Sequence, residues 1–377
     1  MLDSLLGQMT QRDATDLYLT VGSPPIMSAG GDFRRIGTDD LTTADVEGIL
    51  AGTVAAEGLE RFRQERELNV ALEGADGDRF RLNAFRQRGQ TGIVIRRIRS
   101  EIPSMPSLGL PAIVAELAML KRGLVLVTGA TGSGKSTTLA SIIDYRNQHA
   151  FGHIVTIEDP IEFVHSHKRS LVSQREVGVD THSFRQALHN ALRQAPTVLL
   201  LGELRDEETV QAALRFAETG HLVFATLHAT NAAQAIERIV TVHAEHLERQ
   251  VLLQLSLNMK GILSQRLVQR RDLAGRAAAI EVLLNTARVA DLIRKGQIED
   301  LRESMAAGSG EGMQTFDQAL LHLHRSGVIS ADDAIANADS PNDVRLKIRV
   351  EAIDDGAAES GADEIRIEGV PARRSGR

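Results

Sequence analysis

Residues 129–136 read Gly129-Ala130-Thr131-Gly132-Ser133-Gly134-Lys135-Ser136, and they constrain the architecture more than any other segment. They match the phosphate-binding pattern G-x-x-x-x-G-K-[ST] at every fixed position. The apolar run 124–127 before them predicts a buried parallel strand, and residues 137–143 after them predict a helix. A strand, a glycine-rich turn and a helix in this order are the context in which the pattern has its meaning.

The chemistry of this loop is that of a phosphate cradle. Its glycines admit backbone angles closed to other residues, so several N–H groups can turn towards one anion, and the helix that begins near Lys135 adds its positive dipole end. Lys135 would reach the β- and γ-phosphates of ATP, and the Ser136 hydroxyl would hold Mg²⁺. The alternative is a glycine-rich turn that binds nothing, which the flanking strand and helix disfavour. The expected nucleotide-binding residues are Gly129, Ala130, Thr131, Gly132, Ser133, Gly134, Lys135, Ser136 and Thr137.

Composition limits the remaining possibilities. The length of 377 residues favours two or three domains, and 42% apolar residues suffice for a core. No apolar run approaches the length of a membrane span, and the polar N-terminal segment does not predict a secretory signal. The chain has no cysteine, which excludes disulfides and cysteine-ligated zinc. The net charge of −7, with no block of Lys or Arg, counts against a nucleic-acid partner.

The distribution of residue types along the chain divides it into five segments. Residues 1–100 predict a small α/β domain, and residues 101–111, with three prolines, predict a linker short enough to act as a hinge. Residues 112–270 alternate strands and helices, as an α/β doubly wound fold does. Residues 271–350 are expected to be mostly helical. Residues 351–377 are rich in Gly, Ala and charged residues and predict a disordered tail.

Acidic residues follow two of the strands expected in the third segment, at 124–128, 153–157, 197–201 and 222–226. Glu158, Asp159 and Glu162 come directly after the second of these strands. Ligands collect at the carboxyl ends of parallel strands, so we expect these carboxylates, with Ser136, to hold Mg²⁺. The alternative is a solvated acidic turn, which is common.

The third strand ends in Gly202-Glu203, a form of the Walker B pattern in which Gly202 occupies the place of the usual metal-holding Asp. Glu203 would polarise the attacking water or hold a metal-bound water, while Mg²⁺ takes its acid from the preceding cluster. Alternatively, Glu203 caps the following helix, although Asp206 is better placed for that cap.

Histidines bracket the fourth strand. We expect His228, at the phosphate-facing end, to sense the γ-phosphate, and His221, at the other end, to be more structural. Phosphoryl transfer also requires positive charge on the transition state, which ring ATPases often take from an arginine of a neighbouring subunit. Residues 79–99 hold arginines on expected strands, each of which is alternatively an ordinary solvated residue: Arg79, Arg81, Arg86, Arg88, Arg96, Arg97 and Arg99.

Together these segments resemble the secretion ATPase superfamily. GATGSGKSTTLA (129–140), TIEDPIEFVH (156–165), LLLGELRDEET (199–209) and TGHLVFATLHATNA (219–232) correspond to its Walker A, Asp box, Walker B and His box. The Gly-Glu form of Walker B is normal in that superfamily. The resemblance implies a RecA-like P-loop NTPase core, a small N-terminal PAS-like α/β domain and a helical C-terminal region.

Within the superfamily the chain is similar to type IV pilus retraction ATPases, the PilT/PilU group, over residues 5–350. The segments DLYL (16–19), RFRLNAF (79–85), QREVG (174–178) and GMQTFD (312–317) carry this likeness, and ARVADLIR (287–294) is a variant of the group's C-terminal motif. Pilus-assembly and type II secretion ATPases usually have a four-cysteine zinc site and a longer N-terminal region. This chain has no cysteine, which favours the retraction branch. Residues 192–196 and 338–346 resemble the PilU branch more than the PilT branch.

This resemblance implies roles and partners. It assigns Glu162 and Glu203 to the hydrolytic water and metal, His221 and His228 to coupling, and Arg81 and Arg96 to contacts with nucleotide. It also implies a homo-hexameric cytoplasmic ring, peripherally associated with the inner-membrane face. Such a ring would act on a PilC-type platform protein, with a PilT-type ATPase partner, to drive pilus retraction and twitching motility. No nucleic-acid partner is expected.

Two other functions remain open at this point. One is an accessory nucleotide-binding subunit that has little activity alone, which the intact Lys135, Glu162 and Glu203 disfavour. The other is a DNA-translocating RecA-like motor, which the acidic charge balance and the 3% aromatic content disfavour.

Overall fold

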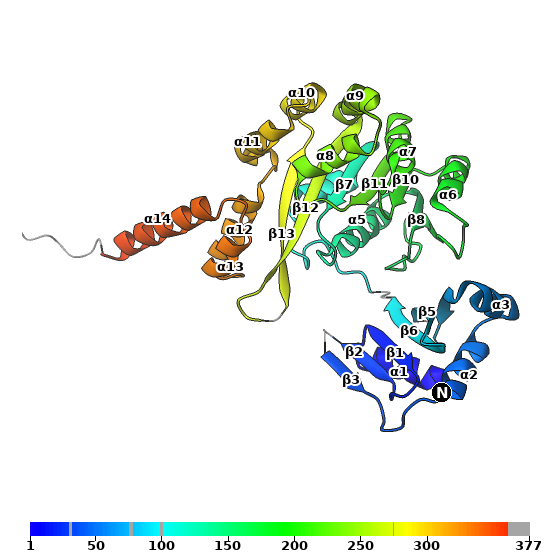
Figure 1. Cartoon of the computed structure of the whole chain (residues 1–377). Coiled ribbons are helices and arrows are strands. Elements are labelled where there is room, and N and C mark those ends of the chain that lie inside the picture. Colours follow the sequence, from blue (N-terminus) through cyan, green and yellow to red (C-terminus); the bar gives the residue numbers. More distant parts are fainter. Residues whose placement is uncertain (30–31, 75–77, 99–100, 274, 361–377) are drawn as a thin grey trace, which may run out of the picture. The chain divides into compact units, whose positions relative to one another are not determined.

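The structure, a computed structural model, describes residues 1–29, 32–74, 78–98, 101–273 and 275–360. Two compact units divide the chain: Met1–Arg266 with Ile280–Gln314, and Leu267–Ala279 with Thr315–Arg377. Figure 1 labels most of their helices and strands.

The N-terminal part of the first unit is an antiparallel sheet with helices. Its strand order is β3-β2-β1-β6-β5-β4. The alternating strands bury one face, where Leu17, Leu82 and Ile95 are fully enclosed. The elements are α1 (Leu2–Gln11), β1 (Asp16–Thr20), β2 (Ile26–Ala29), β3 (Asp32–Arg35), α2 (Thr43–Thr53), α3 (Ala56–Glu65), β4 (Glu67–Glu73), β5 (Arg79–Gln87) and β6 (Gln90–Ile98).

The centre of the first unit is a seven-stranded sheet in the order β13-β12-β7-β11-β10-β8-β9. The six strands from β12 to β9 are parallel to one another. They are β7 (Gly123–Thr128), β8 (Gly152–Glu158), β9 (Ser170–Glu176), β10 (Val198–Leu201), β11 (Leu222–Leu227) and β12 (Met259–Gln269), with β13 (Arg276–Leu284) at the edge. This is the α/β, RecA-like arrangement expected from the sequence.

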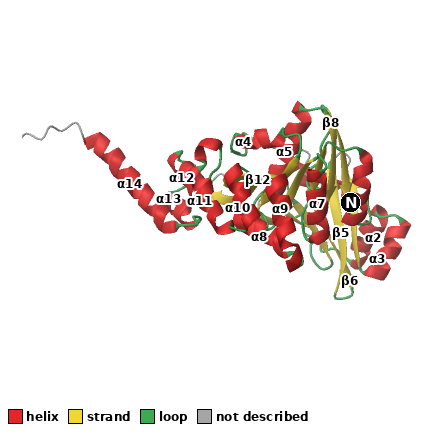
Figure 2. Ribbon diagram, turned by 90° about the horizontal axis from the view of Figure 1, so that it is seen from above, coloured by secondary structure: helices red, strands yellow, loops and turns green. Residues whose placement is uncertain are grey.

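Helices enclose the parallel strands (Figure 2). They are α4 (Ile113–Ala118), α5 (Lys135–His149), α6 (Phe184–Ala191), α7 (Glu207–Glu218), α8 (Ala232–Thr241), α9 (Glu248–Asn258), α10 (Ala287–Lys295) and α11 (Leu301–Ala307). Short 3-10 turns complete this part: η1 (Leu192–Gln194), η2 (Glu245–Leu247), η3 (Ile298–Asp300) and η4 (Ser309–Glu311).

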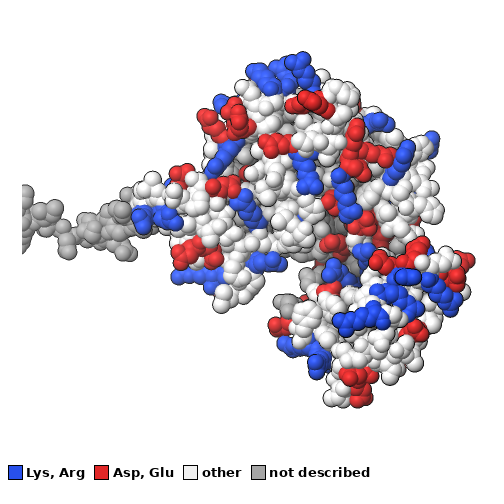
Figure 3. All heavy atoms as spheres, viewed as in Figure 1, with Lys and Arg blue, Asp and Glu red and all other residues white. Residues whose placement is uncertain are grey.

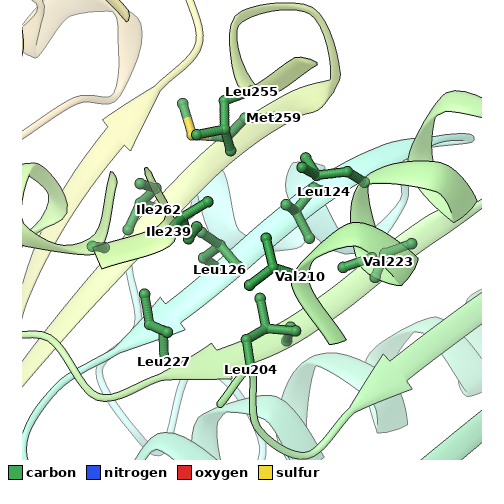
Figure 4. Close-up of a cluster of buried hydrophobic side chains, with 14 of the residues drawn as sticks. Leu124, Leu126, Leu204, Val210, Val223, Leu227, Ile239, Leu255, Met259 and Ile262 are labelled. Carbon is green, nitrogen blue, oxygen red and sulfur yellow. The ribbon is translucent and has the colours of Figure 1, made fainter. Parts of the chain in front are cut away.

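Both faces of the central sheet are buried. Leu124 and Leu126 of β7 pack in one cluster with side chains of α7, α8 and α9, as Figure 4 shows for Val210, Ile239 and Leu255. Val125 and Val127 point to the opposite face, because side chains alternate along a strand, and neither is exposed. Strands that are covered on both faces have continuous apolar runs, which is why these strands could be predicted from the sequence.

The second unit has its own core. Phe316, Leu320 and Val344 pack there with residues from the ends of β12 and β13. Its helices are α12 (Phe316–Arg325), α13 (Ala331–Ala336) and α14 (Pro341–Ser360). In the part of the chain that the structure describes, no helix is both long and apolar enough to span a bilayer.

Some expectations differ from these elements. The four strands predicted between 124 and 226 are confirmed, with ends within one residue. Residues 276–284, inside the region expected to be mostly helical, form β13 instead, because the sheet edge beside β12 takes them. Helix α14 includes residues 351–360 of the expected tail, and residues 361–377 lie outside the described residues.

Candidate nucleotide-binding site

The loop between β7 and α5 has the backbone that its glycines permit. The φ angles of Gly129, Gly132 and Gly134 are 151°, 77° and 88°. At Gly129 a Cβ would lie 2.3 Å from Oγ of Ser133 and 2.6 Å from the carbonyl oxygen of Gln265, so no side chain fits there. The tight approach keeps the loop folded over the start of α5.

The first turn of α5 offers free donors. Its N-cap is Gly134, which provides no side-chain cap, whereas Ser183 and Asp206 cap α6 and α7 through their side chains. Among the described residues, the N–H groups of this turn therefore lack the acceptor that a side-chain cap would supply, and they carry the positive end of the helix dipole. The half-buried hydroxyls of Ser136 and Thr137 lie in the same turn.

Lys135 places a buried positive charge beside these donors. The residue is 8% exposed, and its Nζ donates to the carbonyl oxygens of Gly129 at 3.0 Å and Ala130 at 2.9 Å. Burial lowers the pKa of the ammonium, and the charges of Glu203 and Glu162 oppose that shift. An uncapped helix start, a close-packed glycine loop and a desolvated ammonium fit a phosphate group of a nucleotide.

His228 connects this lysine to Glu203. It follows β11, and its Nδ1 lies 3.5 Å from Nζ of Lys135, while its Nε2 lies 3.3 Å from Oε1 of Glu203. The Glu203 side chain is 19% exposed. Strand β11 lies between β7 and β10 in the sheet, which brings these three residues from separate loops to one point.

Arg205 is a residue of this cluster to which sequence reasoning assigned no role. Its Nε donates to Oε2 of Glu203 at 2.8 Å, and its Nη1 lies 3.5 Å from Oδ2 of Asp159. The hydrogen bond to Glu203 is the main reason that the pKa of Arg205 is raised. Its place two residues after Glu203, in a segment already rich in charge, was the only signal in the sequence.

The acidic cluster at the carboxyl end of β8 is divided between two environments. Desolvation raises the pKa of Glu158, and hydrogen bonds from Thr156 and Gln174 to its carboxylate oppose the shift. Asp159 and Glu162 are exposed. Among the described residues, no three His, Asp or Glu side chains gather as a metal-ion site. Mg²⁺ bound to phosphates needs only one or two protein carboxylates, so these residues and Ser136 remain candidates.

Three further residues were expected to act in the site: His221, Arg81 and Arg96. His221 is at the opposite end of β11, where its Nδ1 lies 3.2 Å from both the Phe216 carbonyl oxygen and Oγ1 of Thr219. Arg81 and Arg96 stand directly opposite each other on β5 and β6. Arg96 donates to Asp16 at 2.8 Å, which raises the pKa of the guanidinium.

The fold and the loop define the core as a RecA-like P-loop NTPase. The family model described as "Type II/IV secretion system protein" matches residues 59–321. The type IV pilus ATPase PilU of Pseudomonas aeruginosa is 47% identical over 96% of this chain and 94% of its own length. The type IV pilus retraction ATPase PilT of the same organism is 41% identical over 90% and 98%.

A solved structure agrees with these sequence matches. The pilus retraction motor PilT with bound ADP superposes with a TM-score of 0.84 and 40% identity, covering 90% of this chain and 98% of that one. The chain therefore belongs to the type II/IV secretion ATPase family, in its PilT/PilU group, and its identity is higher with PilU than with PilT.

Proposed function

We propose that this chain is a motor ATPase that hydrolyses ATP to ADP and phosphate and couples the reaction to type IV pilus retraction and twitching motility. The arrangement that supports the hydrolytic role best is Lys135–His228–Glu203, a cation and an acid held on either side of one imidazole, next to the uncapped start of α5. The PilT/PilU relatives support the biological role, because they are named as pilus ATPases.

The residues divide the chemistry between them. Lys135 and the N–H groups of the loop would bind the β- and γ-phosphates and stabilise the charge that develops on the transferred group. Glu203, oriented by Arg205 and His228, would take up the proton of the attacking water. Ser136, with Glu158, Asp159 or Glu162, would hold Mg²⁺, which neutralises phosphate charge when bound.

Arginines of the N-terminal sheet would complete the site from a neighbouring subunit of a homo-hexameric ring. Arg81 fits this role better than Arg96, because its guanidinium makes only a long hydrogen bond, from Nη2 to Oδ1 of Asn69 at 3.4 Å, whereas Arg96 is paired with the carboxylate of Asp16 at 2.8 Å. Mixing tests the assignment. Arg81→Ala and Glu203→Ala protomers, each inactive alone, should recover ATP hydrolysis when they are assembled together, since some interfaces then carry both intact residues.

The ring would work at the cytoplasmic face of the inner membrane, on a PilC-type platform protein, with a PilT-type ATPase as partner. A second candidate function is that of an accessory subunit that hydrolyses little ATP alone. The higher identity with PilU than with PilT supports this candidate. A DNA motor is disfavoured, because basic and acidic side chains are intermingled on the face drawn in Figure 3.

The deciding experiment is Mg²⁺-dependent ATP hydrolysis by the purified chain, alone and with a PilT-type partner, with Glu203→Ala as the blank. Hydrolysis alone that is lost in the variant would establish a self-sufficient motor. A Glu203-dependent gain that requires the partner would establish the accessory role. If no Glu203-dependent hydrolysis appears with the chain alone or with the partner, both the motor role and the accessory role are refuted.

A further inference from the structure

The segment that carries Glu162 is held by side chains of a neighbouring strand. Residues 159–169 connect β8 to β9 outside the helices and strands. Strand β9 is the edge of the seven-stranded sheet, and its side chains bind backbone groups on both sides of Glu162. Such contacts replace the ladder hydrogen bonds that an irregular segment lacks.

Gln174 makes most of these contacts. Its Nε2 donates to the carbonyl oxygen of Phe163 at 2.9 Å, and its Oε1 accepts from the backbone N–H of His165 at 2.7 Å. The same Nε2 donates to Oε1 of Glu158 at 3.2 Å. One orientation of the amide satisfies all three partners, because the reverse would set an oxygen against two acceptors.

Glu176 completes the set from the other side. Its carboxylate is 3% exposed and accepts from the backbone N–H of Ile161 at 3.2 Å. Gln174 and Glu176 are two residues apart on β9, so they point to the same face of the strand. We call these two side chains the β9 clamp.

The clamp acts on the direction of Glu162. Ile161 and Phe163, its two chain neighbours, are 1% and 8% exposed, whereas Glu162 itself is exposed. Burying both neighbours leaves the carboxylate of Glu162 on the open side of the segment, close enough for its charge to act on Lys135. A shift of the clamped backbone would therefore move this carboxylate relative to the phosphate loop.

We propose that Gln174 and Glu176 are positioning residues for ATP hydrolysis, which hold Glu162 in reach of the nucleotide. This inference rests on the proposed ATPase function. The alternative is that the clamp only stabilises the sheet edge. The two differ in what the loss of the clamp does to turnover compared with the loss of Glu162.

The test compares Gln174→Met, which keeps the length of the side chain and removes its hydrogen bonds, with Glu162→Gln and the double variant. Ser173→Ala is the matched control, because its hydroxyl bonds to His153 of β8 and not to the segment. ATP hydrolysis is measured with Mg²⁺ on the full chain, with the PilT-type partner if the chain alone is silent. Thermal unfolding checks that each variant is folded.

Gln174→Met should lower kcat by roughly 10- to 100-fold, as loss of an outer-shell partner does, and leave KM for ATP unchanged within about twofold. The double variant should be no slower than Glu162→Gln alone, because both changes remove the same function. Turnover of Gln174→Met equal to that of Ser173→Ala, or losses that add in the double variant, would overturn the proposal.

Hydrogen exchange on the nucleotide-free chain tests the clamp without activity. In Gln174→Met the amide of His165 should exchange about tenfold faster, because it loses its acceptor, while β7 and α5 are unchanged. Unaltered exchange would mean that the clamp does not hold the segment. Full turnover in Glu162→Gln would instead refute the catalytic role of Glu162, a result that leaves the exchange measurement intact as a test of the clamp.

Discussion

His228 lies with its Nδ1 atom 3.5 Å from the ammonium nitrogen of Lys135. A lysine ammonium only donates, so this contact is a hydrogen bond in the tautomer whose Nδ1 accepts, and the opposite ring atom, Nε2, faces Oε1 of Glu203 at 3.3 Å. The end of β11 thus links the residue expected to hold phosphate to the residue expected to activate water.

Replacing Lys135 with methionine separates binding from folding. Burial depresses the pKa of this ammonium, so the folded chain holds it at a cost, and Lys135→Met should leave the melting temperature without nucleotide unchanged or raised. At an ADP concentration of about 100 times Kd, ADP with Mg²⁺ should stabilise the parent chain by about 2.7 kcal/mol and the variant not at all.

Thermal unfolding with and without ADP measures this difference. Lys121→Met, at an exposed position just before β7, is the control and should respond to ADP as the parent chain does. An equal ADP response in Lys135→Met would refute the assignment of the phosphate loop.

Replacing Glu203 with alanine should stop hydrolysis and leave ATP binding intact. The carboxylate faces His228 and Arg205, and its charge acts on Lys135 without a direct hydrogen bond or ion pair between the two side chains among the described residues. Loss of a general base typically lowers kcat by about 10²- to 10⁴-fold. The control is Glu207→Ala, in the exposed first turn of α7, which should change neither ATP hydrolysis nor ATP binding. If ATP binding falls together with turnover, Glu203 is a structural or metal-holding residue.

The stability of the chain should depend on His165 in mildly acidic solution. Burial lowers the pKa of His165 to about 4 from 6.5, with the charge of Lys168 in the same direction and that of Asp144 opposed. The unfolded chain therefore binds a proton that the folded chain excludes. This contribution to stability, about 3 kcal/mol, is complete above pH 6.5 and is lost as the pH falls to 4.

Denaturant unfolding between pH 7 and 4 measures this dependence. Its slope should flatten in His165→Leu, because the Nδ1 atom of His165 is buried without a hydrogen-bond partner and an apolar side chain needs none. The exposed His246→Gln is the control. Identical slopes in the parent chain and His165→Leu would show that other groups set the acid sensitivity.

The cap of α7 should have a modest and specific effect on stability. Oδ1 of Asp206 accepts from the backbone N–H of Thr209 at 2.9 Å and from its hydroxyl at 2.8 Å. Asp206→Ala should lower the free energy of unfolding by about 1 kcal/mol, and Asp206→Asn by less, since Asn also caps well. Equal losses in the two variants would mean that the negative charge, and not the cap, is what matters.

The strands that could be predicted from the sequence alone are those buried on both faces of the sheet. Strands β7, β10 and β11 are buried throughout and consist almost entirely of apolar residues, so their residues predict buried parallel strands without knowledge of any neighbour. The cap at Asp206 was also predictable, because N-caps depend on a few adjacent residues, and the structure confirms it.

The edge strands of the sheet could not be predicted from their local sequence in the same way. Strand β9 (Ser170–Glu176) is largely polar, and β13 (Arg276–Leu284) contains an alanine run that favours a helix. In β13 the buried Glu281 accepts from the N–H of Ala232 and the hydroxyl of Ser264, partners that lie far away in sequence. Sheet pairing overrides local preference at both edges.

The site shows the same division. Local sequence determined the phosphate loop and the identity of the acids, because a glycine-rich turn and the end of a buried strand impose their geometry on a few neighbouring residues. Only the tertiary structure decided that His228 stands between Lys135 and Glu203, that Arg205 joins Asp159 to Glu203, and that Gln174 holds the segment of Glu162. These contacts join residues that are brought together by strand order, and strand order is set by the packing of the whole sheet.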